Sequence, residues 1–339
     1  MNKFPRISII TCSYNSNLQV FEKMLLSVKM QTYPKDKIEH LVMDGGSTSG
    51  TLALVKKYNC KIYSDTKLRD KGQARVSMGI KKARGDIVLI LESDNVLIGK
   101  DWLKKMVQPF IENNKIFCTF SAYNHYDNNM PITTRYCALF GSSDPALYYL
   151  GKSEKIPLTQ KYYNKGEIMS EKKNYYVVKF NKNNLPTIGD NGHMFLRRAI
   201  NKVNKAPEKF IHVDAFYELL SYGYDTYGVV KNSITHFSNK KIVDLVKRRV
   251  EVKEDFYNGR FIERKYKIFD PNSIQDIKSL IKFIIFSLTF IIPFFRSLMG
   301  YLRIPDTAWF LHPIICFLML AGYGTSEIKW ILKKRFTII

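Results

Sequence analysis

The sequence has few cysteines, and their spacing offers no structural framework. They are odd in number, form no C-x-x-C pair and are scattered along the 339 residues: Cys12, Cys60, Cys118, Cys137 and Cys316. A disulfide scaffold and a zinc site are therefore excluded. A G-x-G-x-x-G segment is also absent, so a dinucleotide-binding Rossmann domain would lack its phosphate loop.

Acidic residues are scarce relative to basic ones. The chain has 30 Asp and Glu against 53 Lys and Arg, which gives a formal net charge of +23. Such an excess favours nucleic acid, phosphorylated metabolites or the acidic face of a membrane as partners, but it does not choose between them. The apolar run at residues 7–10 is too short for a secretory signal and no cleavage site follows it, which predicts a cytoplasmic location for the soluble part.

Apolar residues, in contrast, are plentiful. They make up 45% of the chain, with 14% aromatic residues, which excludes a disordered protein. Short β-rich runs at residues 7–10, 38–43, around 62 and 86–91 alternate with segments of helical spacing at residues 18–31, 51–58 and 74–83. This order predicts an α/β fold with a mostly parallel sheet flanked by helices.

Sheets of this kind bind ligands in the loops beyond the carboxyl ends of their strands. Asp44 leaves such a strand just before Gly45 and Gly46, which allow a ligand to approach the backbone. A carboxylate there could accept the imide N–H of a uracil or the hydroxyls of a ribose. The alternative is a simple turn in which Ser47 caps the next helix.

Two carboxylates, Glu92 and Asp94, follow the buried strand at residues 86–91. Mg²⁺ and Mn²⁺ prefer oxygen ligands and commonly bridge protein carboxylates to phosphate oxygens. The alternative is a loop whose Asp94 and Asn95 cap a helix that starts near Lys100.

An ordered series of motifs runs through residues 5–115: T-x-x-Y-N at 11–15, S-V-x-x-Q-T-Y-P at 27–34, D-G-G-S-T at 44–48, D-x-G at 70–72, A-x-G-D at 83–86 and E-x-D at 92–94. Together these motifs resemble the family 2 glycosyltransferases, which are inverting enzymes of the GT-A fold. The series is far more specific than any single motif in it.

The resemblance implies a nucleotide-sugar donor and a divalent metal, Mg²⁺ or Mn²⁺. It places at the donor Thr11, Tyr14, Asn15, Asp44, Gly45, Asp70, Gly72, Gln73, Arg75 and Ser93, and at the metal Glu92, Asp94 and His236. Glu92 departs from the family pattern because an aspartate is usual there. Arg75 replaces a small residue, and it is either a ligand of the donor diphosphate or a solvated helix residue. His236 is either a ligand or a structural histidine.

The second half of the resemblance concerns the acceptor. Asp190, Asn191 and Gly192 look like the family's acceptor loop before a strand at residues 194–198, and Asp214 matches its catalytic base. His212 and Val213 stand where an acidic neighbour is usual. Without the resemblance, Asp190 would be an ordinary turn residue and Asp214 an ordinary helix cap.

The last seventy residues are strongly apolar. Residues 283–295 would span about 20 Å as a helix and residues 307–323 about 25 Å, less than the roughly 30 Å of a bilayer core. A membrane-associated hairpin, a re-entrant pair or helices in the interface are therefore predicted, with the basic flanks on the cytoplasmic side. The alternative is a helical pair packed on a soluble core.

We therefore expect three parts. Residues 1–120 form the nucleotide-sugar-binding half of a GT-A domain, residues 121–270 the acceptor-binding half with a basic helix, and residues 271–339 a hydrophobic hairpin or membrane anchor. The predicted reaction transfers a sugar to an acceptor hydroxyl, on a lipid-linked or other saccharide of a cell-surface glycan or glycoprotein. The alternatives are a polyprenyl-phosphate glycosyl synthase and a non-catalytic basic module tethered to the membrane. No nucleic acid partner is expected.

Overall fold

The computed structural model describes residues 4–238, 241–256 and 264–336. The chain divides into two compact units, one from residues 1–125 and 162–237 and the other from residues 126–161 and 238–339. The second unit therefore combines an internal segment with the apolar C-terminal part of the chain.

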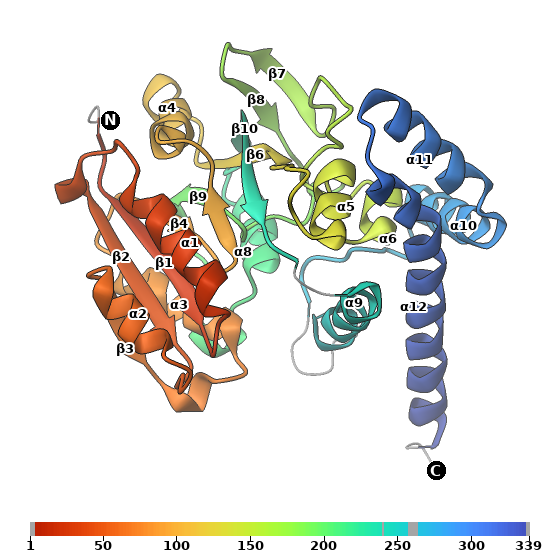
Figure 1. Cartoon of the computed structure of the whole chain (residues 1–339), viewed down its shortest axis with the longest axis horizontal. Coiled ribbons are helices and arrows are strands. Elements are labelled where there is room, and N and C mark those ends of the chain that lie inside the picture. Colours follow the sequence, from red (N-terminus) through yellow and green to blue (C-terminus); the bar gives the residue numbers. More distant parts are fainter. Residues whose placement is uncertain (1–3, 239–240, 257–263, 337–339) are drawn as a thin grey trace. The chain divides into compact units, whose positions relative to one another are not determined.

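The first unit contains a mixed sheet, which has ten strands in the described part of the chain (Figure 1). Its order is β3 (Lys61–Ser64), β2 (Ile38–Asp44), β1 (Ile7–Ser13), β4 (Ile87–Ile90), β9 (His193–Leu196), β6 (Cys118–Asn124), β10 (Thr226–His236), β8 (Tyr175–Lys179) and β7 (Glu167–Glu171), with β5 (Asn95–Leu97) paired to β10. The first four strands are parallel, as predicted. From β9 onward most pairings are antiparallel, so the parallel prediction holds only for this first half.

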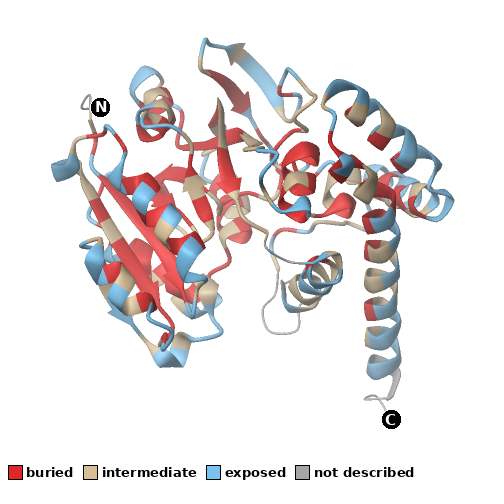
Figure 2. Cartoon of the chain, in the orientation of Figure 1, coloured by how far each residue is buried: buried red, intermediate tan, exposed pale blue. Residues whose placement is uncertain are grey.

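Helices of the first unit accompany the sheet: α1 (Leu18–Lys29), α2 (Thr51–Lys57), α3 (Gly72–Lys82), α4 (Trp102–Glu112), α7 (Arg197–Ile200) and α8 (His212–Leu220), with short 3₁₀ turns at Lys35–Lys37, Thr66–Leu68 and Pro207–Lys209. Asn17 caps α1 by accepting a hydrogen bond from the Val20 N–H at 3.2 Å, and the apolar stripe of α1 is buried. β1, β2 and β4 are almost fully buried (Figure 2). The polar loops that follow these strands are thus held on a rigid support.

The second unit is helical in its described residues. It comprises α5 (Ile132–Phe140), α6 (Pro145–Tyr149), α9 (Ile242–Phe256), α10 (Ile274–Thr289), α11 (Ile291–Arg303), the 3₁₀ turn Thr307–Phe310 and α12 (Leu311–Phe336). Phe140, Phe283, Trp309 and Met319 share one buried apolar cluster. One face of the C-terminal helices therefore packs on a protein core, as the alternative interpretation expected.

The C-terminal helices differ in length from the sequence prediction. Ser273 caps α10, since its Oγ accepts a hydrogen bond from the Asp276 N–H at 3.2 Å. α10 and α11 meet at an 80° bend, where Phe290 has a φ of +61°. α12 continues past residue 323 to Phe336. The predicted end of the second apolar helix at residue 323 is therefore wrong. By length and composition, the segment Thr307–Lys333 is the one continuous helix in the described residues that could cross a membrane.

Candidate active site

Three strand-end loops meet at the carboxyl edge of the parallel strands. The Asn15 N–H donates a hydrogen bond to Ser47 Oγ at 2.9 Å, and the Asn15 Oδ1 accepts one from the Thr48 N–H at 2.9 Å. Ser16 Oγ donates to Ser93 Oγ at 2.9 Å. The predicted residues Asn15 and Ser93 therefore belong to loops that lie side by side, and Asn15 adopts a φ of +44° to make these bonds.

The Asp44 carboxylate is hydrogen-bonded by neighbouring residues of the protein. Its carboxylate accepts from the N–H groups of Gly46 and Ser47 at 2.7 and 2.9 Å, from Ser64 Oγ at 2.9 Å and from Ser47 Oγ. Burial alone would raise the pKa of Asp44, but these hydrogen bonds together hold it below its usual value. Because a carboxylate offers about four acceptor positions, Asp44 shapes the loop in this conformation. Ser47 does not cap the next helix, whose N-cap is Gly50.

Arg75 lies beneath the same loops. Its side chain is only 8% exposed, and its Nη1 donates to the Ser13 carbonyl at 2.9 Å. The interpretation of Arg75 as a solvated helix residue is therefore wrong. A Cβ on Gly45 would lie 2.1 Å from Arg75 Nη1, so the glycine is what lets the guanidinium approach the backbone.

The other predicted donor residues fall into two groups. Thr11 is fully buried and donates to the Leu91 carbonyl at 2.7 Å, so it ties β1 to the end of β4. Gly72 starts α3, and its carbonyl accepts from Cys12 Sγ at 3.5 Å. Tyr14 and Asp70 are exposed, and the Arg69 guanidinium lies 5.2 Å from the Tyr14 ring centroid. The exposed pair is accessible to a ligand, whereas Thr11 is structural.

Carboxylates and a histidine gather after β4. Asp94 Oδ2 lies 3.4 Å from His236 Nε2, because β5 pairs with β10 in a register that sets His236 opposite Asn95. Glu92 lies near the same charges. Burial, followed by the negative charges of Asp94 and Asp190, raises the pKa of Glu92 to about 8, although His236 and Arg75 oppose the shift.

This set fits a divalent cation by its chemistry. Within the described ranges, no three His, Cys, Asp or Glu side chains converge closely enough to form a preformed metal cage. The carboxylates of Glu92 and Asp94 are nevertheless oxygen ligands of the kind that Mg²⁺ and Mn²⁺ prefer. A positive ion would offset both the burial and the negative charge of Asp94 that raise the pKa of Glu92.

The predicted acceptor loop is pinned beside these carboxylates. Gly189, Asn191 and Gly192 all have positive φ values, of +120°, +44° and +86°. Asn95 Nδ2 donates to Asn191 Oδ1 at 3.2 Å, and the Gly192 N–H donates to the Ile90 carbonyl at 2.8 Å. The structure thus brings Asp190 into electrostatic range of Glu92.

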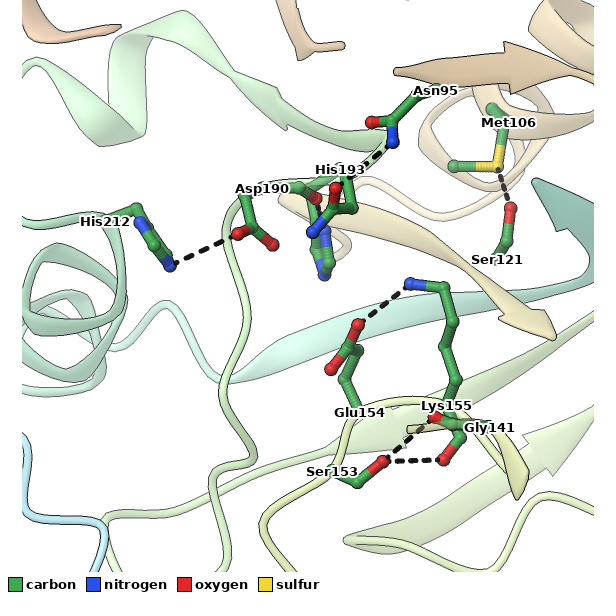
Figure 3. A network of polar contacts seen from close by, with 11 residues as sticks. Asn95, Met106, Ser121, Gly141, Ser153, Glu154, Lys155, Asp190, His193 and His212 are labelled. Carbon is green, nitrogen blue, oxygen red and sulfur yellow. Dashed lines mark hydrogen bonds and ion pairs between the residues drawn. The ribbon is translucent and has the colours of Figure 1, made fainter. Parts of the chain in front are cut away.

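His212 also lies at the site, although no role was predicted for it from the sequence. Figure 3 shows its ring directed at Asp190, with 3.8 Å between Nε2 and Oδ2. Gln73, predicted at the donor, contacts His212 through Oε1, 2.9 Å from the ring Nδ1 and 3.0 Å from the backbone N. Asp214 lies in the same first turn of α8 and is 8% exposed. The only sequence signal for His212 was its place two residues before Asp214.

Comparisons with known proteins concern the family and the fold of the chain. The family profile described as "Glycosyl transferase family 2" matches residues 8–203. The poly(ribitol-phosphate) β-N-acetylglucosaminyltransferase TarS of Staphylococcus aureus is 35% identical over 104 residues, which cover 29% of this chain and 18% of TarS. A Methanococcus voltae dolichyl N-acetyl-α-D-glucosaminyl phosphate 3-β-D-2,3-diacetamido-2,3-dideoxy-β-D-glucuronosyltransferase is 32% identical over 111 residues, which cover 31% of this chain and 33% of the relative.

A solved structure matches over most of the chain. The mannosyltransferase PcManGT of Pyrobaculum calidifontis, in complex with GDP-Man and Mn²⁺, has a TM-score of 0.53 and 13% identity, and the match covers 96% of this chain and 87% of PcManGT. At this identity the likeness concerns the fold, and it confirms the predicted GT-A architecture. The chain spans a third or less of the two curated relatives named above.

Proposed function

The chain belongs to glycosyl transferase family 2, and we propose that it transfers a sugar from a nucleotide diphosphate sugar to an acceptor hydroxyl with inversion. One observation carries the proposal. The donor loops, the Glu92 to Asp94 carboxylates and the Asp190 loop lie at one edge of the sheet, joined by the hydrogen bonds of Ser16 and Asn95. A donor and an acceptor must meet at such an edge for a displacement to occur.

The residues of the donor side have two proposed roles: some support the loops, and others contact the donor. Asp44, Gly45 and Arg75 support the loops, while the exposed Tyr14 and Asp70 are placed to contact the nucleoside or the diphosphate. A Mg²⁺ or Mn²⁺ ion held by Glu92, Asp94 and His236 would supply positive charge for the leaving diphosphate. Arg75 lies close enough to Glu92 to oppose the rise in the pKa of that carboxyl. It adds a fixed positive charge to this region.

The acceptor side must remove a proton from the attacking hydroxyl. Asp190 and Asn191 lie on the pinned loop next to the metal carboxylates and are placed to orient that hydroxyl. The first turn of α8 holds two groups able to take a proton, Asp214 and His212. Attack in a single displacement on the anomeric carbon inverts its configuration, and no covalent sugar–enzyme intermediate is required.

A panel of UDP-, GDP- and dTDP-sugars, with and without Mn²⁺, tests this proposal in a thermal-shift assay. We expect one nucleotide to raise Tm, and the rise to depend on the metal. Folded protein that responds to none of these donors, and releases no nucleotide from any of them, would contradict the transferase function.

The acceptor is proposed to be lipid-linked, with the catalytic unit on the cytoplasmic side of a membrane. The supporting observation is an apolar outer face on α10 and α11, with exposed fractions of 49% for Ile281, 58% for Leu288, 56% for Phe295 and 67% for Leu302. An exposed apolar face of this extent is typical of a membrane interaction site. Lys278 and Lys282 lie on the same α10 helix, where they would favour anionic headgroups.

Cosedimentation with vesicles tests this membrane contact. Phosphatidylglycerol vesicles should retain the full chain better than phosphatidylcholine vesicles, and Leu288→Glu with Phe295→Glu should release it because both side chains are exposed. Val243→Glu is the matched control, since Val243 is 71% exposed but lies on α9. Equal retention of the double variant and the wild type would contradict the proposal.

A further inference from the structure

Two arginines of α11 indicate how this helix meets a membrane. We infer that α11 lies flat in the interface of a bilayer, between headgroups and acyl chains, and that Arg296 and Arg303 bind lipid phosphates there. This inference rests on the membrane contact proposed above and specifies its geometry. It does not depend on the chemistry of the transferase site.

One side of α11 is fixed to the protein. Its buried residues are Pro293, Ser297 and Gly300. Ser297 Oγ donates to the Trp309 carbonyl at 2.7 Å, and a Cβ on Gly300 would lie 2.5 Å from the Trp309 ring. This close packing fixes the rotation of α11 about its own axis, so the side that faces outward is also fixed.

The outward side of α11 is apolar. Ile291, Phe295 and Leu302 are 56%, 56% and 67% exposed, and Figure 2 shows such exposed residues along the helix. Their spacings of four and seven residues set them on one face. A helix with such a face binds a membrane by inserting that face at the boundary between headgroups and acyl chains.

Arg296 and Arg303 lie along the border between the outward side and the packed side. Each directly follows a residue of the apolar face, Phe295 or Leu302, and both are exposed. Being seven residues apart, they share one side of the helix and are separated by about 10 Å along its axis. Arginines at such a border cover apolar surface with their stems and place their charged ends at the level of water and phosphate.

Arg296 is held in a corner made by two aromatic rings. The rings of Tyr148 and Tyr149 meet at 86°, and the guanidinium carbon lies 5.3 Å from both centroids. Arg296 Nη1 also donates to the Tyr148 hydroxyl, which uses one of five N–H donors. The Tyr149 hydroxyl lies 3.1 Å from Nε2 of the buried His312, so the corner is rigid. A guanidinium positioned in this way loses little rotamer freedom when it binds a phosphate.

The second arginine is also turned toward the protein. Arg303 Nη1 donates to the Thr159 carbonyl at 3.5 Å, in the same internal segment that carries Tyr148 and Tyr149. Both guanidinium groups therefore lean to one side of α11, away from the apolar face. Two cations on one flank of an apolar helix suit a layer of anionic headgroups.

The two arginines distinguish a helix that lies in the membrane from one that spans it. In a helix along the bilayer normal, one guanidinium at the phosphates would set the other about 10 Å away in depth, either in the hydrocarbon, which is costly, or above the membrane with part of the apolar face. The 13 residues of α11 cover about 20 Å, less than the roughly 30 Å of a bilayer core. The 80° bend also prevents α10 and α11 from forming one straight span. A helix lying flat places both arginines at the phosphate level.

Depth measurements by EPR on phosphatidylglycerol vesicles test the orientation. Nitroxide labels are attached to Ile291→Cys or Leu302→Cys, in a Cys60→Ser background because the other four native cysteines are buried. We expect both labels at equal depth, about 5–10 Å into the boundary between headgroups and acyl chains. A depth difference near 16 Å, about the axial length of eleven helical residues, would overturn the inference, as would two labels that remain in water.

Vesicle partitioning of arginine variants tests the phosphate contacts. Arg296→Gln should lower the partition coefficient about fivefold, and the double variant with Arg303→Gln about 25-fold, with Tm unchanged. Arg198→Gln is the control, because it removes the same charge from an exposed position on α7 and should leave partitioning unchanged. Equal partitioning of Arg296→Gln and Arg198→Gln would overturn the phosphate contacts.

Retention of the wild-type chain separates this inference from the membrane contact on which it rests. If phosphatidylglycerol vesicles retain the wild type but the labels differ in depth or the arginines have no effect, the inference fails alone. If the vesicles do not retain the wild type, the proposed membrane contact fails first and the inference fails with it.

Discussion

The donor loops and the ionisable groups across the site from them use their polar side chains in different ways. In the donor loops, Asp44 and Thr11 are buried and bonded to their own chain. Across the site, Asp94 and His212 are partly exposed and face other ionisable groups, with 43% and 20% of their side chains accessible. The most recognisable motif residue, Asp44, therefore builds the support, while the less distinctive Asp94 and His212 keep part of their side chains accessible.

The largest effect should come from Asp94, the carboxylate proposed to hold the metal. Asp94→Ala removes an oxygen ligand and should lower kcat/KM for metal-dependent donor turnover by roughly 10²–10³-fold. Its effect on Tm should be small because the side chain is 43% exposed. Steady-state kinetics with and without EDTA measure this, and Asp36→Ala, at a side chain 74% exposed, is the control. Unchanged turnover would remove Asp94 from the site.

Asp44→Asn should show the opposite pattern, with a large change in stability. The buried carboxylate accepts hydrogen bonds from Gly46, Ser47 and Ser64, and an asparagine in its place brings an NH₂ group against those donors. We expect a loss of about 2–3 kcal/mol in the free energy of unfolding, measured by urea denaturation. Asp94→Asn is the matched control and should cost less than about 0.5 kcal/mol. Equal losses in both variants would contradict the comparison.

The pH dependence of this difference follows from the lowered pKa of Asp44. A carboxyl whose folded pKa lies below its unfolded value, about 3.9, adds full stability above that value and loses it as the pH falls through the folded pKa. The contribution of the Asp44 charge should therefore be constant near neutral pH and shrink below about pH 4. Urea denaturation of wild type and Asp44→Asn along this range measures it.

Local patterns explain which features could be predicted from the sequence. The strands and helices up to β4 each carry their own periodicity and turn residues, and they were predicted to within a few residues. β7 and β8 were not predicted, because residues 124–184 are rich in Tyr and Lys and show no clear alternation. The antiparallel half of the sheet depends on pairings between distant segments, such as His193 with Ile90.

The same limit applies to the site. The sequence placed Asp44, Glu92 and Asp94 at the ends of strands and Asp190 in a loop before one, and the structure brings these segments together. It could not reveal that Ser64 would occupy the Asp44 carboxylate, because that contact spans twenty residues. The bonds between Gln73 and His212, 139 residues apart, were equally invisible, so a lone histidine carried no signal of its own.

The smallest effect should come from a substitution of Gly45. Its effect on stability tests how closely Arg75 packs against this glycine. A Cβ at this position would lie 2.1 Å from Arg75 Nη1 and 3.1 Å from the Arg69 Cα. The guanidinium is the flexible end of a long side chain, but it is buried and bonded to the Ser13 carbonyl, so it can yield only by giving up that bond. We expect Gly45→Ala to cost about 1–2 kcal/mol in the free energy of unfolding.

In an Arg75→Ala background the same substitution should cost clearly less, because the obstructing atom is gone. The difference between the two costs is the coupling energy of the pair. Equal costs in both backgrounds would show that the backbone of Arg69, and not the guanidinium, sets the requirement for glycine.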